Sequence, residues 1–222
     1  MIEKAYSVLS DGGLCLLKAD IGYGLFGTSE EAIKKMFEIK GRPTSNPCIV
    51  LGNVKVLEEL CPTLPSTYRD FILNLIPKTT LAVRYTADLK SALWSSLPPW
   101  VQAHSSNAGT IAIFLNTGNT TERLCERAFQ DRQLIVGSSS NRSGAGNNYR
   151  FEDIPEYIRS RVDFSLDEGV AKYANDQKLA TTIVDLTDLS IRRRGVNFDL
   201  IADALDRLKP AKSQGGAGHI GQ

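Results

Sequence analysis

An apolar run passes directly into a polar, glycine-containing one at Leu134-Ile135-Val136-Gly137-Ser138-Ser139-Ser140-Asn141-Arg142-Ser143-Gly144. Its first five residues are typical of a short buried strand, and the hydroxyl residues and glycine after them are typical of a loop. Such a loop exposes backbone N–H groups that can cradle a phosphate. The segment matches neither the P-loop nor the dinucleotide-binding glycine fingerprint, so an ordinary surface loop is the alternative interpretation.

Strand-like and helix-like patterns alternate on both sides of this segment. The predicted strands cover Gly13–Leu17, Cys48–Leu51, Thr79–Arg84 and Thr110–Leu115, and a β-hairpin is expected over Thr181–Leu186 and Leu189–Arg193. Helices are predicted from Thr28 to Lys40 and over Val54–Leu60, Ser66–Ile76, Thr121–Gln130 and Asp199–Leu208. This interleaving predicts an α/β fold in which helices cover a twisted sheet.

The composition is that of an ordinary globular protein. The chain has 222 residues, of which 42% are hydrophobic and 23% charged, and its formal net charge is +1. We expect one domain over residues 1–209 and a disordered Gly-rich tail over residues 210–222. The net charge favours neither nucleic acid nor membrane as a general partner, although it would hide a local basic cleft.

No targeting or metal-binding pattern is evident in the sequence. Residues 1–18 lack the continuous apolar core of a signal peptide, and no apolar run is long enough to span a membrane. The four cysteines lack CxxC spacing, and with only two histidines a zinc site is not expected. Cys15 and Cys48 lie in apolar runs and are expected in the core. Reduced thiols indicate an intracellular, cytoplasmic protein, and the net charge with the absence of a long apolar run suggests no membrane partner.

Two cations lie one residue apart in Lys40-Gly41-Arg42-Pro43, where the predicted helix ends. An arginine offers a fork of donors and a lysine a point charge, so the pair could bracket a polyphosphate. The alternative is a helix C-cap whose basic residues complement the helix dipole.

A third polar segment follows near the end of the chain. Thr181-Thr182-Ile183-Val184-Asp185 precedes Ile191-Arg192-Arg193-Arg194-Gly195. Three consecutive arginines could neutralise phosphate or contact RNA, whereas a solvated charge run is the alternative.

In their order and spacing these segments resemble the YrdC family, whose best-known members are L-threonylcarbamoyladenylate synthases of tRNA modification. The segments that carry the resemblance are Lys18-Ala19-Asp20-Ile21-Gly22-Tyr23-Gly24-Leu25, Lys40-Gly41-Arg42-Pro43 with Asn46-Pro47, Ser139–Gly144, Thr181–Asp185 and Arg193-Arg194-Gly195. The resemblance covers roughly Ala5 to Val196. It implies an α/β fold with a twisted, open mixed sheet, flanking helices and a basic concave cleft.

The resemblance also implies a set of functional residues. Residues Lys40, Arg42, Ser139, Asn141, Thr181 and Arg193 would hold ATP, with Lys40 and Arg42 as the catalytic pair. Lys18, Asp20 and Tyr23 would face the second substrate. The implied substrates are ATP with Mg²⁺, bicarbonate and an amino acid, threonine in the best-known members. The reaction yields a carbamoyl adenylate and pyrophosphate, so it needs charge neutralisation and positioning more than acid–base catalysis.

The sequence departs from the family pattern mainly where the pattern places the amino acid. The usual threonines of the first segment are Ala19 and Ile21, and Phe114 stands where an arginine is usual. Leu51 replaces a frequent histidine. Three functions therefore stay open: the threonine reaction, a related reaction with another amine, and a non-catalytic role in binding RNA through the cleft.

Overall fold

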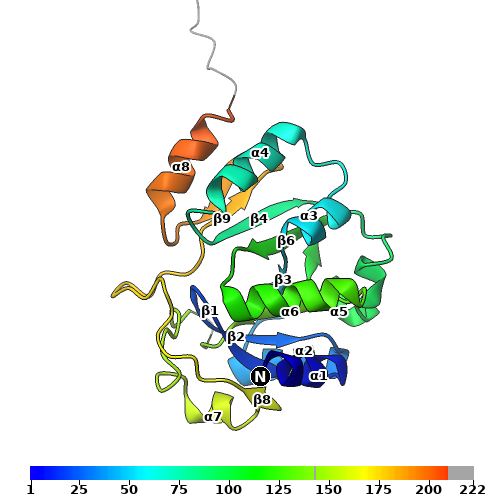
Figure 1. Cartoon of the computed structure of the whole chain (residues 1–222), viewed down its shortest axis with the longest axis vertical. Helices are drawn as coiled ribbons and strands as arrows, with labels where there is room; N and C mark the ends of the chain where they lie inside the picture. The colour runs from blue at the N-terminus through cyan, green and yellow to red at the C-terminus, as the bar shows by residue number, and fades with distance from the viewer. Residues whose placement is uncertain (143, 210–222) are drawn as a thin grey trace, which may run out of the picture.

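The computed structural model describes residues 1–142 and 144–209. The predicted tail over residues 210–222 lies outside this range, and the single domain over residues 1–209 stays a prediction. The described residues form a 10-stranded open sheet in the order β10-β9-β4-β6-β3-β7-β2-β1-β8, with β5 paired to β6 (Figure 1). Parallel and antiparallel pairs both occur, so the predicted mixed sheet with flanking helices is confirmed.

The first half of the chain builds one end of the sheet and its covering helices. Its elements are α1 (Ile2–Ser10), β1 (Cys15–Ala19), β2 (Gly22–Gly27), α2 (Glu30–Lys40), β3 (Ile49–Leu51), α3 (Val54–Leu60), α4 (Ser66–Leu75), β4 (Leu81–Thr86), η1 (Trp94–Ser96) and α5 (Pro99–Ala103). Helix α2 begins after Ser29, whose hydroxyl accepts from the Ala32 N–H, and ends at Gly41 with φ 54°. The cap is therefore Ser29 rather than the expected Thr28.

The second half completes the sheet at both edges. Its elements are β5 (Ser106–Asn107), β6 (Thr110–Leu115), α6 (Asn119–Gln130), β7 (Ile135–Ser139), α7 (Glu156–Arg159), β8 (Phe164–Ser165), β9 (Ile183–Asp185), β10 (Ser190–Arg193) and α8 (Phe198–Asp206). The predicted hairpin is confirmed as the antiparallel pair β9 and β10. In Figure 1, α8 lies beside α4 at one end of the molecule, and α6 packs on α1 and β1 nearer the other.

The two faces of the sheet differ in character. One face carries a row of paired, fully buried residues: Val83, Ile113, Val50 and Val136. Such residues form the core under the helices. On the other face Arg84 lies between Ala112 and Asp185, and Gly137 lies between Ile49 and Phe26. Because side chains alternate between faces, Arg84, Asp185 and the small residues Ala112 and Gly137 share this second face.

The expected core cysteines are confirmed, since Cys15 and Cys48 are buried and unpaired. Over residues 1–142 and 144–209, no helix has the length and apolar character needed to cross a membrane.

Candidate functional site

A cleft of about 590 Å³ opens on the face of the sheet that carries Arg84. It is lined by residues from β1, β2, β4, β6, β7, β9 and β10 and by the 42–49 segment. Four arginines reach it, namely Arg42, Arg84, Arg192 and Arg193. Of the six predicted nucleotide-binding residues, the cleft lining includes Arg42, Ser139, Thr181 and Arg193, whereas Lys40 and Asn141 do not line it.

Lys40 is buried beneath the loop that follows β7. Its ammonium donates to the backbone carbonyl of Ser139 and, at 2.8 Å, to that of Asn141. Burial, and next the positive charge of Arg42, lowers the pKa of Lys40 to about 7. The lysine therefore holds the loop in place from below. Asn141 is buried as well, and its Oδ1 has no hydrogen-bond partner among the described residues.

Arg42 crosses from the end of α2 to β7. Its Nη1 donates to Ser138 Oγ at 3.2 Å, and its other donors reach the carbonyls of Asn46 and Pro47. These acceptors are all neutral, so the guanidinium keeps its net positive charge. Desolvation lowers its pKa, but an arginine with a lowered pKa is still charged near neutral pH.

Arg193 lies on the same side of the cleft as Thr181. Its Nε donates to the Thr181 carbonyl at 2.9 Å. Gly195 makes this packing possible, because an added Cβ would lie 2.1 Å from the Ala180 carbonyl oxygen. Desolvation, and next the charge of Arg42, lowers the pKa of Arg193. The two arginines therefore act on each other across the cleft and would share a polyanion between them.

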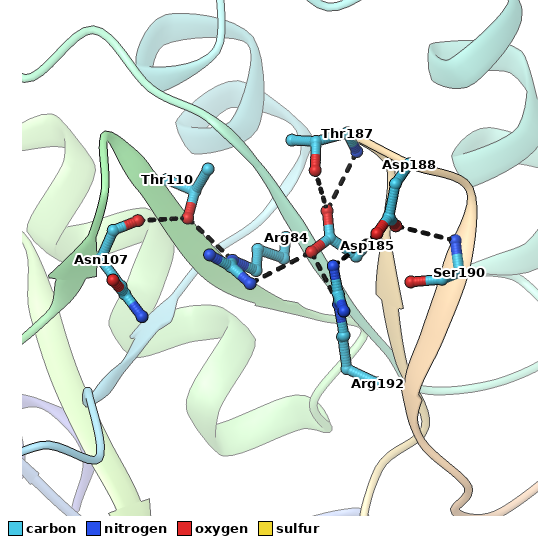
Figure 2. Close-up of polar contacts among 8 residues, drawn as sticks. All are labelled: Arg84, Asn107, Thr110, Asp185, Thr187, Asp188, Ser190 and Arg192. Carbon is cyan, nitrogen blue, oxygen red and sulfur yellow. Dashed lines mark hydrogen bonds and ion pairs between the residues drawn. The ribbon is translucent and has the colours of Figure 1, made fainter.

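Arg84 and Arg192 meet at a buried carboxylate (Figure 2). Asp185 Oδ2 accepts from Arg84 Nη1 at 3.1 Å and from Arg192 Nε at 2.9 Å, and its Oδ1 accepts from the Thr187 hydroxyl and N–H. Arg84 Nε also donates to Thr110 Oγ1 at 2.7 Å. Burial favours the neutral acid, but these donors outweigh it, so the pKa of Asp185 lies below its ordinary value.

The predicted second-substrate residues lie mostly away from the cleft. The Lys18 ammonium donates to the Glu168 carbonyl, and Asp20 pairs loosely with Lys172 at 3.8 Å. Tyr23 contributes to the cleft lining, but its hydroxyl donates to the Gly169 carbonyl at 2.9 Å. Desolvation raises the pKa of this phenol to about 12. The polar ends of Lys18 and Tyr23 thus hold the segment around residue 168.

Three of the positions that depart from the family pattern lie on the cleft wall. Ala19, Ile21 and Phe114 all line it and are almost fully buried. Leu51 is buried but does not line the cleft. The wall is therefore apolar at positions where a polar side chain would otherwise face a ligand.

The cleft lining contains no carboxylate among the residues that the structure describes. Asp185, which pairs with two of the lining arginines, already uses both oxygens for Arg84, Arg192 and Thr187. The described part of the chain also shows no cluster of three metal-ligating side chains. These residues do not fit a protein-held Mg²⁺, so a magnesium ion would enter as the counter-ion of a bound polyphosphate.

Sequence reasoning missed Arg84 and Thr110 as cleft residues. A signal was present, because Ala82, Arg84 and Thr86 alternate with Leu81, Val83 and Tyr85 along β4. That period-two pattern separates a small and polar face from an apolar one. The pairing of Arg84 with Asp185 could not be read from the sequence, since the two lie about a hundred positions apart.

The fold and site together define a class: a mixed α/β protein with an arginine-lined cleft on one face of its sheet. The chain belongs to the Sua5/YciO/YrdC family, because the family model described as "Telomere recombination" matches residues 7–195.

Individual relatives resemble the chain at low identity. The threonylcarbamoyl-AMP synthase of Acinetobacter baumannii is 27% identical over 144 residues, which is 64% of this chain and 72% of that protein. Pyrococcus abyssi Sua5, solved in complex with L-threonine, superposes with a TM-score of 0.71 at 22% identity, over 87% of this chain and 54% of that one. E. coli YciO superposes with a TM-score of 0.68 at 18% identity, over 88% of this chain and 89% of that one. The chain thus spans about half the length of the archaeal Sua5.

Proposed function

We propose that this protein is an ATP-dependent nucleotidyltransferase that forms L-threonylcarbamoyl-AMP from threonine, bicarbonate and ATP for tRNA modification. The observation that carries the proposal is that Arg42 and Arg193 both line the cleft, Arg42 beside Ser138 and Arg193 beside Thr181. Neither arginine has an ion-pair partner among the described residues. Two uncompensated guanidinium groups fit a triphosphate, and the name of the bacterial relative supports the product.

In the reaction, the amine of the amino acid first takes up CO₂ derived from bicarbonate to give a carbamate. A carbamate oxygen then bonds to the α-phosphorus of ATP, the bond from that phosphorus to the bridging oxygen breaks, and pyrophosphate leaves with the electron pair. Arg42 and Arg193 stabilise the charge on the phosphates, and Ser139 and the loop after it supply further donors. Lys40 acts on this step through the loop it supports. Mg²⁺ would arrive with ATP and offset part of its charge.

A second function, the use of an amine other than threonine, is favoured by a specific observation. Ala19, Ile21 and Phe114 leave apolar surface in the cleft. A threonine hydroxyl left unpaired against such surface costs about 1–3 kcal/mol. Another amino acid, with a less polar side chain, would avoid that cost.

The decisive experiment is to incubate the purified protein with ATP, Mg²⁺, bicarbonate and single amino acids, and to identify adenylates by mass spectrometry. If the unaltered protein forms threonylcarbamoyl-AMP and Arg42→Ala does not, the result supports the main proposal. A different carbamoyl adenylate supports the second function. ATP binding without any adenylate, together with salt-sensitive binding of double-stranded RNA, would replace both with the RNA-binding role.

We expect the protein in the cytoplasm, because its four cysteines are free and buried.

A further inference from the structure

The four cleft arginines form two groups with different charge balance. Arg42 and Arg193 donate only to neutral acceptors. Arg84 and Arg192 instead share Asp185, and Arg192 Nη2 also pairs with Asp188. The second group contains two cations and two anions, so its net charge is close to zero. A polyanion therefore gains more from the first group, whereas the second suits a ligand with a single negative charge.

Within the second group, each arginine keeps one terminal nitrogen without a partner among the described residues, and Arg84 is the less exposed of the two. Arg192 uses Nε for Asp185 and Nη2 for Asp188. Arg84 uses Nε for Thr110 and Nη1 for Asp185, and its Nη2 has no partner among the described residues. Figure 2 shows its guanidinium held between Thr110 on one side and Asp185 on the other. The side chain is 28% exposed and lines the cleft, whereas Asp185 is 1% exposed.

The surroundings of Arg84 leave room for a small organic ligand. Its cross-strand partner on β6 is Ala112, a small residue on the same face, and Phe114 lies two residues further along that strand. Both line the cleft. A fixed fork of donors beside a small and an apolar residue is suited to a carboxylate that carries an organic side chain.

We propose that Arg84 binds the α-carboxylate of the amine substrate, and that Asp185 and Thr110 are positioning residues that orient its guanidinium. The proposal rests on the proposed function, in which that substrate is an amino acid. It assigns the phosphates to Arg42 and Arg193 and the carboxylate to Arg84.

The test compares two probes that differ only in the carboxylate. L-threonine and L-threoninamide are titrated calorimetrically into the protein saturated with α,β-methylene-ATP and Mg²⁺. For Arg84→Met we expect the Kd of L-threonine to rise about tenfold or more, because a charge-assisted pair is lost, while the Kd of L-threoninamide changes less than about twofold. Arg84→Lys, which keeps the charge without the fork, should give an intermediate value. The control is Arg194→Met, because Arg194 lies over the Phe198 ring and does not line the cleft.

Three outcomes would overturn the proposal. Equal losses for threonine and threoninamide would mean that Arg84 has a structural role. An equally large loss of nucleotide affinity in Arg84→Met would assign the residue to the phosphates. If the unaltered protein does not bind threonine, Arg84 cannot be the binding residue for its carboxylate. If threonine binds with the expected dependence on Arg84 but no adenylate forms, the binding site stands and the proposed reaction fails.

Discussion

Lys40 does not line the cleft, but its buried ammonium supports the loop after β7, which does. The sequence predicts that Lys40 binds phosphate, because a lysine and an arginine flank a glycine at the end of a helix. In the structure Gly41 caps α2 in the left-handed conformation, and Lys40 turns inward to the carbonyls of Ser139 and Asn141. Both interpretations of the segment therefore hold in part: Lys40 supports the site and Arg42 lines it.

Lys40 should make stability depend on pH near neutrality. Its pKa is about 7 in the folded protein and close to 10.5 in the unfolded chain. Between these values the unfolded chain holds a proton that the folded protein has lost, so the free energy of unfolding rises with pH. Urea denaturation from about pH 6.5 to about pH 8.5 should show this rise, and Lys40→Met should remove it. Equal slopes in both proteins would contradict the assignment. Measurements stop near pH 8.5 because the raised pKa values of the buried cysteines, about 12 for Cys15, act in the opposite direction above it.

Replacing the buried Asp185 should lower the free energy of unfolding more than replacing the exposed Asp188 does. Replacing it with asparagine removes the charge from a carboxylate that is 1% exposed and holds Arg84 and Arg192. We expect Asp185→Asn to lower the free energy of unfolding by about 1–3 kcal/mol. The matched control, Asp188→Asn, breaks a pair in which both side chains are nearly half exposed and should cost less than about 1 kcal/mol. Chemical denaturation of the two variants measures the difference, and equal losses would contradict it.

At the scale of elements, local signals predicted most helices and strands but not all. Helices α3 and α4 and strand β6 follow their hydrophobic periods closely. Strand β2 was not recognised because three of its six residues are glycines, which weaken any strand pattern, yet the whole strand is buried. Helix α1 was also missed, although it buries Ala5, Tyr6 and Leu9 at helical spacing.

Sheet order and the pairing of site residues depend on contacts between distant segments, which no local pattern encodes. Arg42, Ser139, Thr181 and Arg193 could be placed at the cleft because they follow a family pattern. Lys18 and Asp20, expected beside the second substrate where the sequence departs from the pattern, do not line the cleft. Side chains alternate along β1, so Ala19 faces the cleft rather than Lys18, and Asp20 follows the end of the strand.

The backbone just after β10, where it packs on the segment before β9, should be sensitive to a single methyl group. A Cβ at Gly195 would lie 2.1 Å from the Ala180 oxygen and 2.5 Å from the Thr182 nitrogen. Gly195→Ala must therefore move the strand end that carries Arg193. We expect it to cost about 1–3 kcal/mol of stability and to weaken ATP binding. In Gly109→Ala the added Cβ meets nothing within 4 Å, so only the strain of φ 77° remains and ATP affinity should be kept. Unchanged ATP affinity in Gly195→Ala would contradict this account.

At the scale of the whole molecule, ATP should stabilise the fold through the cleft that joins its distant strands. A ligand present at one hundred times its Kd raises the free energy of unfolding by about 2.7 kcal/mol. Denaturation with and without ATP and Mg²⁺ should show this increase in the unaltered protein. It should be largely lost when Arg42 and Arg193 are both replaced by alanine and measured at the same ATP concentration. An increase of equal size in that double variant would place the nucleotide elsewhere.

The position of β9 beside β4 has a consequence for synthesis on the ribosome. Residues 183–185 pair in parallel with residues 82–84, so the sheet gains Arg193 and Asp185 only after a hundred further residues have been translated. Until then Arg84 has no carboxylate to orient it and Arg42 has no partner across the cleft. A nascent chain with all its earlier strands in place would still lack Arg193, which we propose as a nucleotide ligand. Under the proposed function, ligand binding would therefore begin only after β9 and β10 have emerged and paired with the sheet.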